Sequence, residues 1–156
     1  MSATTPPPNG LAPLSAEEEA VMRALGRMML VLPRALNNDL EREQRMTASE
    51  YSVLRHLSES ACGHLRMSEL AQACDMSLSG MTRLAAKLEA QGYVKRIKCD
   101  SDARGWNAVL TENGLARLRE AWPTHLASVR HHIFEHLTEL DLPQLAKALN
   151  AIAGDS

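Results

Sequence analysis

The chain has 156 residues, and 45% of them are hydrophobic although only 3% are aromatic. This length fits one domain with a substantial core, and that core must be built mainly from aliphatic side chains. The formal net charge of −2 excludes a globally basic nucleic-acid binder, and the longest apolar run, residues 28–32, is too short to span a membrane. Because the core must be mainly aliphatic, we expect a fold of helices packed on helices.

The first 14 residues are rich in proline and carry no charged side chain, so we predict a disordered leader rather than a signal sequence. Residues 15–156 are predicted to form one domain. Ser15 and Glu18 form a capping box that begins a helix extending to about residue 45, and Pro33 is expected to kink that helix or displace its hydrogen bonds. Apolar residues recur along one side of it: Val21, Leu25, Met28, Met29, Leu32, Leu36 and Leu40.

The next segment contains the signals for three shorter helices. Thr47 and Glu50 form a second capping box, and a short helix begins near Met67. After a tight turn, Ser77 is a suitable N-cap for an amphipathic helix that Gly92 can end in a left-handed conformation. Helical spacing predicts one buried stripe in this last helix: Met81, Leu84, Ala85 and Leu88.

The opposite face of that helix carries small and hydrogen-bonding residues, followed by cations: Ser79, Gly80, Thr82, Arg83 and Lys87. Small side chains allow a helix to approach base edges closely, and hydroxyl groups can donate or accept hydrogen bonds there. An arginine can bridge guanine or hold a phosphate. An ordinary surface helix with a solvated polar face is the alternative for this element taken alone.

A basic hairpin follows. Residues 94–98 and 107–111 have the composition of short strands around a polar tip, residues 100–105. Four cations lie on or near it: Lys95, Arg96, Lys98 and Arg104. An arginine at the tip suits the narrow minor groove, and Asp102 is placed to hold the guanidinium of Arg104. A solvated charged turn is the alternative for the hairpin alone.

Helix, turn, helix and hairpin in this order predict a winged helix-turn-helix, with a DNA-binding lobe over residues 47–111. Between residues 77 and 106 there are six cations and three acids, whereas the rest of the chain has 11 cations and 16 acids, so the positive charge is local. The predicted DNA-binding residues are Ser77, Ser79, Gly80, Thr82, Arg83, Lys87, Arg96, Lys98, Asp102 and Arg104.

The remaining helices are predicted to form a dimerisation scaffold. Thr111 caps a long helix that is expected to bend near Pro123, and Asp141 begins a last helix. The terminal helical regions, residues 15–45 and 112–154, carry more apolar surface than one small lobe can cover. We therefore expect a two-fold homodimer, with an intramolecular helical cap as the alternative. The predicted fold is mainly α with a small β-hairpin wing and long N- and C-terminal dimerisation helices.

The sequence resembles the MarR (multiple antibiotic resistance regulator) family of winged-helix repressors, from about residue 15 to residue 153. The resemblance rests on Leu70-Ala71, Thr82-Arg83-Leu84, Leu88-Glu89, Gly92, Val94, Arg96, Asp102, Arg104, Leu110-Thr111 and Gly114. Two positions depart from the family pattern. Ala103 stands where the family often has a basic residue, and Trp106 is larger than expected just after the tip.

The resemblance implies a cytoplasmic transcription regulator, acting as a repressor, that binds a pseudo-palindromic operator in double-stranded DNA as a homodimer. Similar family members often respond to small phenolic or anionic ligands in a cleft between the dimerisation helices and the DNA lobe. Such a ligand would release DNA by favouring a lobe spacing that mismatches the operator. The rival hypothesis is a protein-interaction module that keeps the winged-helix form without reading DNA.

An enzyme is a more distant alternative, because the sequence contains no phosphate-cradling loop, nucleophile elbow or zinc-protease spacing. No cofactor or metal is expected. His132 and His136 are one helical turn apart, but no cluster of cysteines or carboxylates in the sequence completes a set of metal ligands with them. The widely spaced Cys62, Cys74 and Cys99 fit a reducing cytoplasm.

Overall fold

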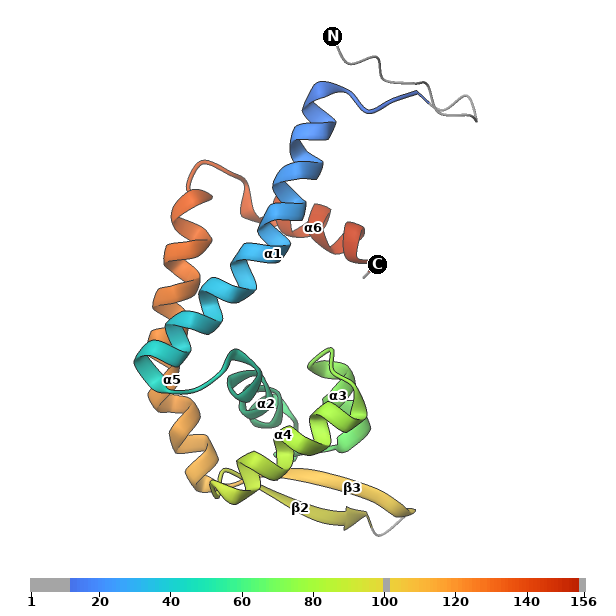
Figure 1. The fold of residues 1–156 in the computed structure, drawn as a ribbon, viewed down its shortest axis with the longest axis vertical. Coiled ribbons are helices and arrows are strands. Elements are labelled where there is room, and N and C mark those ends of the chain that lie inside the picture. Colours follow the sequence, from blue (N-terminus) through green and yellow to red (C-terminus); the bar gives the residue numbers. More distant parts are fainter. Residues whose placement is uncertain (1–11, 100–101, 155–156) are drawn as a thin grey trace. The chain divides into compact units, whose positions relative to one another are not determined.

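The computed structural model describes residues 12–99 and 102–154, and it describes Cys99 and residues 102–104 by their backbone alone. Most of the described chain is helical, with a small sheet (Figure 1). The elements are α1 (Ala16–Gln44), α2 (Ala48–Glu59), β1 (His64–Arg66), α3 (Met67–Ala73), α4 (Leu78–Ala90), β2 (Val94–Cys99), β3 (Asp102–Leu110), α5 (Glu112–His132), the 3-10 helix η1 (Phe134–His136) and α6 (Leu142–Ala153). The chain divides into two units, residues 1–35 and 36–156.

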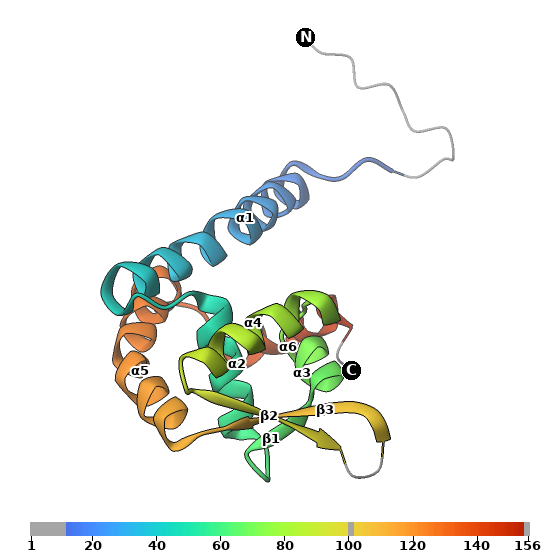
Figure 2. The same cartoon turned by 60° about the horizontal axis from the view of Figure 1, so that its bottom comes forward.

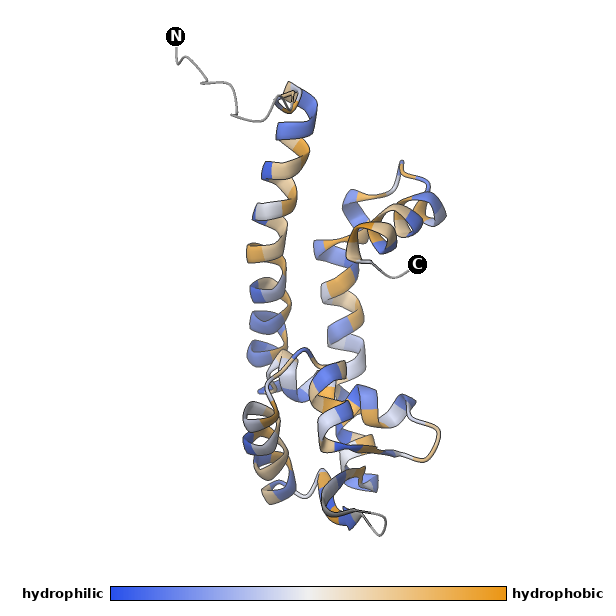
Figure 3. Ribbon diagram, turned by 90° about the vertical axis from the view of Figure 1, so that its right-hand side faces the viewer, coloured by the Kyte–Doolittle hydropathy of each residue, from blue (hydrophilic) through white to orange (hydrophobic). Residues whose placement is uncertain are grey.

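The first unit contains the greater part of α1. The predicted capping box is confirmed, because the Ser15 backbone N–H donates to the Glu18 carboxylate at 2.8 Å and the Glu18 N–H donates to Ser15 Oγ at 3.2 Å. The helix is continuous through Pro33. Hydrophobic and hydrophilic residues alternate along α1 (Figure 3). Six large hydrophobic side chains on it are more than two-fifths exposed: Val21, Met22, Met28, Met29, Leu30 and Val31. The predicted leader lies largely outside the described residues.

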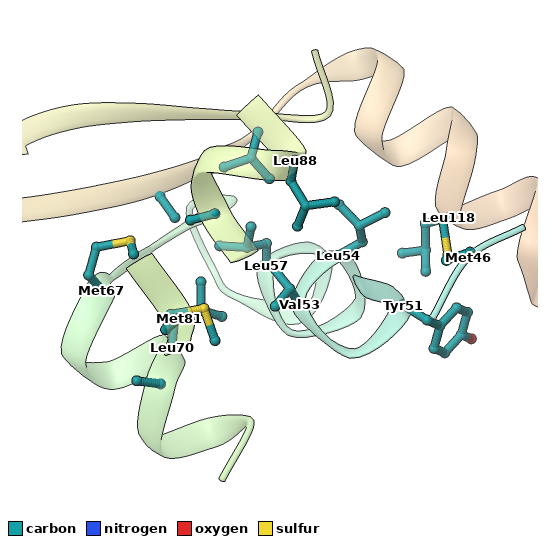
Figure 4. Packing of buried hydrophobic residues seen from close by; sticks show 14 of the residues in the cluster. Met46, Tyr51, Val53, Leu54, Leu57, Met67, Leu70, Met81, Leu88 and Leu118 are labelled. Atoms are coloured by element: carbon teal, nitrogen blue, oxygen red, sulfur yellow. The ribbon is translucent and has the colours of Figure 1, made fainter. Parts of the chain in front are cut away.

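The second unit is organised around α2, α3 and α4. The capping box at Thr47 and Glu50 is confirmed on both sides. Figure 4 shows Leu54 and Leu57 of α2 packed with Leu70 of α3 and with Met81 and Leu88 of α4, and none of these five side chains is measurably exposed. Each such side chain contributes about 1.5–3 kcal/mol by leaving water. This core fixes α4 against α2 and α3.

The sheet has three antiparallel strands in the order β1-β3-β2. Strand β1 was not predicted, because three residues are too few to show an alternating pattern. The predicted hairpin tip was too long. Strand β3 already begins at Asp102, so only residues 100–101 separate β2 from β3. The hairpin lies beside α3 and α4 (Figure 2).

Thr111 was predicted as the last strand residue as well as the cap of the next helix, and only the second assignment is confirmed. Its hydroxyl donates to the Gly92 carbonyl at 2.7 Å and accepts from the Gly114 N–H at 3.0 Å, which ends the strand and begins α5. A Cβ atom at Gly114 would collide with the Tyr93 carbonyl oxygen. The junction between the wing and α5 therefore depends on this glycine.

The last helices begin where the sequence predicted. α5 is one helix through Pro123, and the bend expected there stays a prediction; Ile133 lies just beyond the end of the helix. Asp141 caps α6 by accepting a hydrogen bond from the Gln144 N–H at 3.0 Å. In the described part of the chain, no helix combines the length and the apolar character needed to cross a membrane.

Candidate nucleic-acid interface

Helix α4 has the local structure that its sequence predicts. Ser77 Oγ accepts a hydrogen bond from the Gly80 N–H at 3.1 Å, and Gly92 follows the helix with a φ of 78°. In the predicted stripe, Met81, Ala85 and Leu88 are fully buried and Leu84 is half-buried. The opposite face of α4 is therefore the one available to a partner.

Four residues of that face are exposed: Ser79, Thr82, Arg83 and Lys87. Thr82 Oγ1 donates to the Leu78 carbonyl at 2.8 Å, so its oxygen is left to accept a hydrogen bond. Arg83 has no hydrogen-bond or ion-pair partner within the described residues. A guanidinium held on a capped helix without a partner is suited to bind an acceptor from another molecule.

Lys87 differs from the other three residues because it is already paired. Its Nζ atom lies 2.8 Å from Oε1 of Glu50, whose side chain is only 6% exposed. Burial by itself would raise the pKa of the Glu50 carboxyl, but hydrogen bonds from Lys87 and Thr47 outweigh it, so the pKa lies below its ordinary value. The ion pair joins α4 to the first turn of α2.

Arg96 of the wing is also paired within the protein. Its Nε and Nη2 atoms each lie 2.7 Å from the Glu89 carboxylate, and its backbone N–H donates to the same group at 3.1 Å. These hydrogen bonds lower the pKa of the Glu89 carboxyl. They attach the beginning of the wing to the end of α4.

Lys98 is exposed, and its Nζ atom lies 5.8 Å from the centroid of the Trp106 ring. The backbone of Asp102 and Arg104 belongs to β3, but their side chains lie outside the described part of the chain. Lys98 pairs with Trp106, whereas Cys99 pairs with Asp102, so the register shifts within this part of the wing. The predicted contact between Asp102 and Arg104 stays a prediction.

A groove of about 340 Å³ lies between α4, the start of α3 and the wing. Its lining consists of Arg66, Met67, Ser68, Leu78, Thr82, Arg96, Gly105 and Trp106. Two predicted site residues, Thr82 and Arg96, meet there. The sequence prediction lacked Arg66 because β1 was missed. The sequence prediction also lacked Trp106. Side chains alternate along β3, so Trp106 lies on the same face of the strand as the buried Ala108, and this alternation could have identified it.

A second polar cluster joins the end of α1 to α5. The carboxylate of Asp39 accepts from Ser128 Oγ at 2.6 Å, lies 2.8 Å from His132 Nε2 and pairs with Arg42 at 2.7 Å. The hydrogen bond from Ser128, followed by that from His132, lowers the pKa of Asp39 to about 2. His131 lies 3.0 Å from Glu135. Among the described side chains, no three His, Cys, Asp or Glu residues are grouped to hold a metal ion.

Two of the cysteines can be placed by their side chains. Cys62 is exposed, whereas Cys74 is half-buried with its sulfur 3.8 Å from Ser52 Oγ. Burial raises the pKa of the Cys74 thiol. Cys74 therefore behaves as a small packed side chain, and the side chain of Cys99 lies outside the described part of the chain.

Comparison with known proteins agrees with this architecture. The family model described as the MarR family matches residues 46–105. The MarR family regulator Sco3205 from Streptomyces coelicolor, solved in complex with DNA, is 34% identical, with a TM-score of 0.83 over 92% of this chain and 90% of that one. AbsC, another MarR family regulator from the same organism, is 38% identical, with a TM-score of 0.82 over 92% and 97% of the two chains.

A third relative was found by sequence. The transcriptional regulator PecS from Dickeya dadantii is 25% identical over 118 residues, which are 75% of this chain and 70% of that protein. The family model covers the elements from α2 to β2 and the beginning of β3, and the two Streptomyces structures extend the likeness over nearly the whole chain. This chain belongs to the MarR family of transcriptional regulators.

Proposed function

We propose that this protein is a cytoplasmic, homodimeric repressor that binds a pseudo-palindromic operator in double-stranded DNA. One observation carries the proposal: α4 is held by its core face and its cap next to the basic wing, and it exposes Arg83, which has no partner among the described residues. The related Sco3205 was solved in complex with DNA, which supports the same role here. Each lobe would place α4 in the major groove and the wing in the adjacent minor groove.

The proposed contacts divide into two groups. Ser79, Thr82 and Arg83 are exposed on α4, and we assign them to base edges or to the phosphates next to them. The capping residue Ser77 and the small Gly80 allow the first turn of α4 to approach DNA closely. A Cβ atom at Gly80 would lie 3.1 Å from Ser77 Oγ, so this turn has little room for a larger residue.

The wing contributes the second group. Lys98 is exposed on β2 and suits a phosphate contact, and Arg104 is assigned to the minor groove with Asp102 as its holder. Lys87 and Arg96 remain proposed DNA contacts, but their ion pairs with Glu50 and Glu89 favour a positioning role. Each would have to leave a carboxylate in order to bind a phosphate.

A homodimer would account for the exposed apolar residues of the terminal helices. α6 exposes Leu142, Leu149 and Ile152, and the first unit exposes a further apolar series on α1. Two lobes held together would bind DNA at high effective concentration. Deletion of residues 141–156 should therefore weaken dimerisation and DNA binding together, as followed by light scattering and operator titration. A folded monomer that binds a full operator as tightly as the intact chain would contradict the dimeric mechanism.

The experiment that tests the DNA-binding role is selection of bound genomic fragments by the purified protein, followed by titration of the recovered duplex. Arg83→Ala should weaken binding by about 1–3 kcal/mol and relax the preference at particular base pairs. Arg83→Lys serves as the matched control, because it keeps the charge but loses the planar fork. An equal loss for all sequences would make Arg83 a phosphate contact.

Arg104→Ala should also weaken operator binding by about 1–3 kcal/mol at fixed salt while leaving the fold and dimer unchanged. Unaltered affinity would remove the minor-groove assignment. Release by a small phenolic or anionic ligand is a further expectation from the family resemblance, and titration of candidate ligands into the protein–DNA complex tests it.

A protein-interaction module is the second candidate. It is favoured by the large apolar side chains that the lobe exposes, since Leu78 is 55%, Ile97 48% and Trp106 45% accessible. Aromatic and apolar anchors of this kind are frequent in protein interfaces. An intact dimer that prefers no DNA fragment in the selection would support this candidate instead.

A further inference from the structure

The wing carries an exposed tryptophan on the side that faces the helices. Side chains alternate along a strand, and directly paired residues of neighbouring strands share a face. Val94 and Ala108 are buried, at 1% and 0% exposure, so their face of the wing is the one that packs on the core. Trp106 and its pairing partner Lys98 continue this face beyond the end of the core. Trp106 is therefore turned toward the helices without being covered by them.

Trp106 forms one wall of the groove between the wing and α4. Leu78 and Thr82 of α4 form the opposite wall, and Arg66 and Ser68 at the start of α3 also line it. The groove thus combines apolar surface with two arginine side chains, Arg66 and Arg96, of which Arg96 is already paired with Glu89. This composition suits a ligand that is both anionic and partly apolar.

A DNA strand is both anionic, through its phosphates, and partly apolar, through its sugars. The proposed docking would bring such a strand to the groove between α4 and the wing. Adjacent major and minor grooves are separated by a single sugar–phosphate backbone. A protein that inserts α4 into the major groove and the wing into the next minor groove must hold this backbone between the two elements. The groove lined by Thr82 and Trp106 lies between α4 and the wing.

We propose that this groove receives one sugar–phosphate strand, with Trp106 packed against the sugars and Arg66 facing the phosphates. The inference rests on the proposed DNA-binding function and adds two residues to its contacts. The indole N–H of Trp106 is a suitable donor to a phosphate oxygen. The Nζ atom of Lys98, on the neighbouring strand, lies 5.8 Å from the centroid of the Trp106 ring. This cation–π contact orients the indole and adds positive charge beside it.

Two substitutions test the assignment with the duplex recovered in the genomic selection. Trp106→Ala should lower affinity about fivefold for the operator and for a scrambled duplex alike, because backbone contacts carry no sequence information. It should leave the salt dependence unchanged, whereas Arg66→Gln should reduce the salt slope by about one, as loss of a phosphate contact requires. Unchanged affinity of Trp106→Ala, or a loss confined to the operator, would overturn the assignment.

Ile97→Ala is the matched control. Ile97 is 48% exposed on the same hairpin, but its position in the alternation places it on the opposite face from Trp106. Its replacement should leave affinity at the wild-type value. An equal loss in Ile97→Ala and Trp106→Ala would show that both weaken the wing in general, which would contradict the groove contact.

Tryptophan fluorescence gives an independent readout, because the chain has two tryptophans. In Trp122→Phe the emission comes from Trp106, and in Trp106→Phe it comes from Trp122. The duplex should protect Trp106 from acrylamide quenching and should leave the quenching of Trp122 unchanged. If fluorescence anisotropy of a labelled duplex shows binding while Trp106 stays equally accessible, the inference is wrong although the DNA-binding function stands. If the intact chain binds no duplex, the proposed function itself fails.

Discussion

Apolar side chains recur at helical spacing both in α4 and in the first unit of the chain, but they meet different surroundings. Met81 and Leu88 of α4 have no exposed surface, whereas Met28 and Met29 of the predicted apolar series of α1 are 45% and 66% exposed. The same pattern therefore marks a core in one helix and an uncovered face in the other. Periodicity shows which residues share a face, but it does not show whether the same chain or a second copy covers that face.

The comparison predicts the largest effect for a core residue of the lobe. Leu88→Ala should lower the free energy of unfolding by about 2–5 kcal/mol, because it leaves a cavity beneath α4. Urea unfolding followed by circular dichroism measures this loss. Thr82→Ala, on the exposed face of the same helix, should change stability by less than about 0.5 kcal/mol. Equal losses in the two variants would contradict the assignment of the two faces.

Replacement of two glycines by alanine should change the stability of the protein in opposite directions. Gly114→Ala should destabilise the protein by about 1–3 kcal/mol, because the added Cβ would collide with the Tyr93 carbonyl. A Cβ at Gly26, in the middle of α1, meets nothing within 4 Å. Gly26→Ala should therefore stabilise by up to about 1 kcal/mol through helix propensity. Thermal unfolding of both variants checks the signs, and a destabilised Gly26→Ala would show that a partner occupies that space in solution.

The exposed face of α1 can be tested directly as a dimer interface. Leu30→Lys should raise the dimer dissociation constant at least about tenfold, because it would bury an unpaired charge. Sedimentation equilibrium measures the constant, and Leu30→Met keeps the apolar contact as a control. A dimer unaffected by Leu30→Lys would leave this residue outside the interface and would favour the intramolecular helical cap.

A pH-dependent effect is expected where the end of α1 meets α5. Asp39→Asn should destabilise the protein by about 1–2 kcal/mol at pH 7, since the hydrogen bonds to Asp39 favour its charged form. The pKa of Asp39 is lowered from 3.8 to about 2, so this stabilisation is present above pH 3.8 and is lost as the pH falls toward 2. Urea unfolding of both proteins from pH 2 to pH 7 should show the difference closing in that window. A difference that stays constant would point to a packing effect instead.

The local signals in the sequence predicted much of this protein. The predicted helix caps are all confirmed: Ser15, Thr47, Ser77, Thr111 and Asp141. They could be predicted because a cap is a hydrogen bond between residues only two or three positions apart in the sequence. The buried stripe of α4 and the antiparallel wing follow from similarly short-range patterns. These features carried the resemblance to the MarR family, which the comparisons confirmed, and they predicted the exposed face of α4, whose role in DNA binding stays a proposal.

Contacts between distant residues were decided only by the tertiary structure. Lys87 looks like a free surface cation in the sequence, but packing of α4 on α2 places it against Glu50. Arg96 is likewise paired with Glu89, and Trp106 meets Leu78 and Thr82 across a groove. A side chain's partner depends on how whole elements pack, and that packing is a sum of many weak contacts that no short segment of the sequence contains.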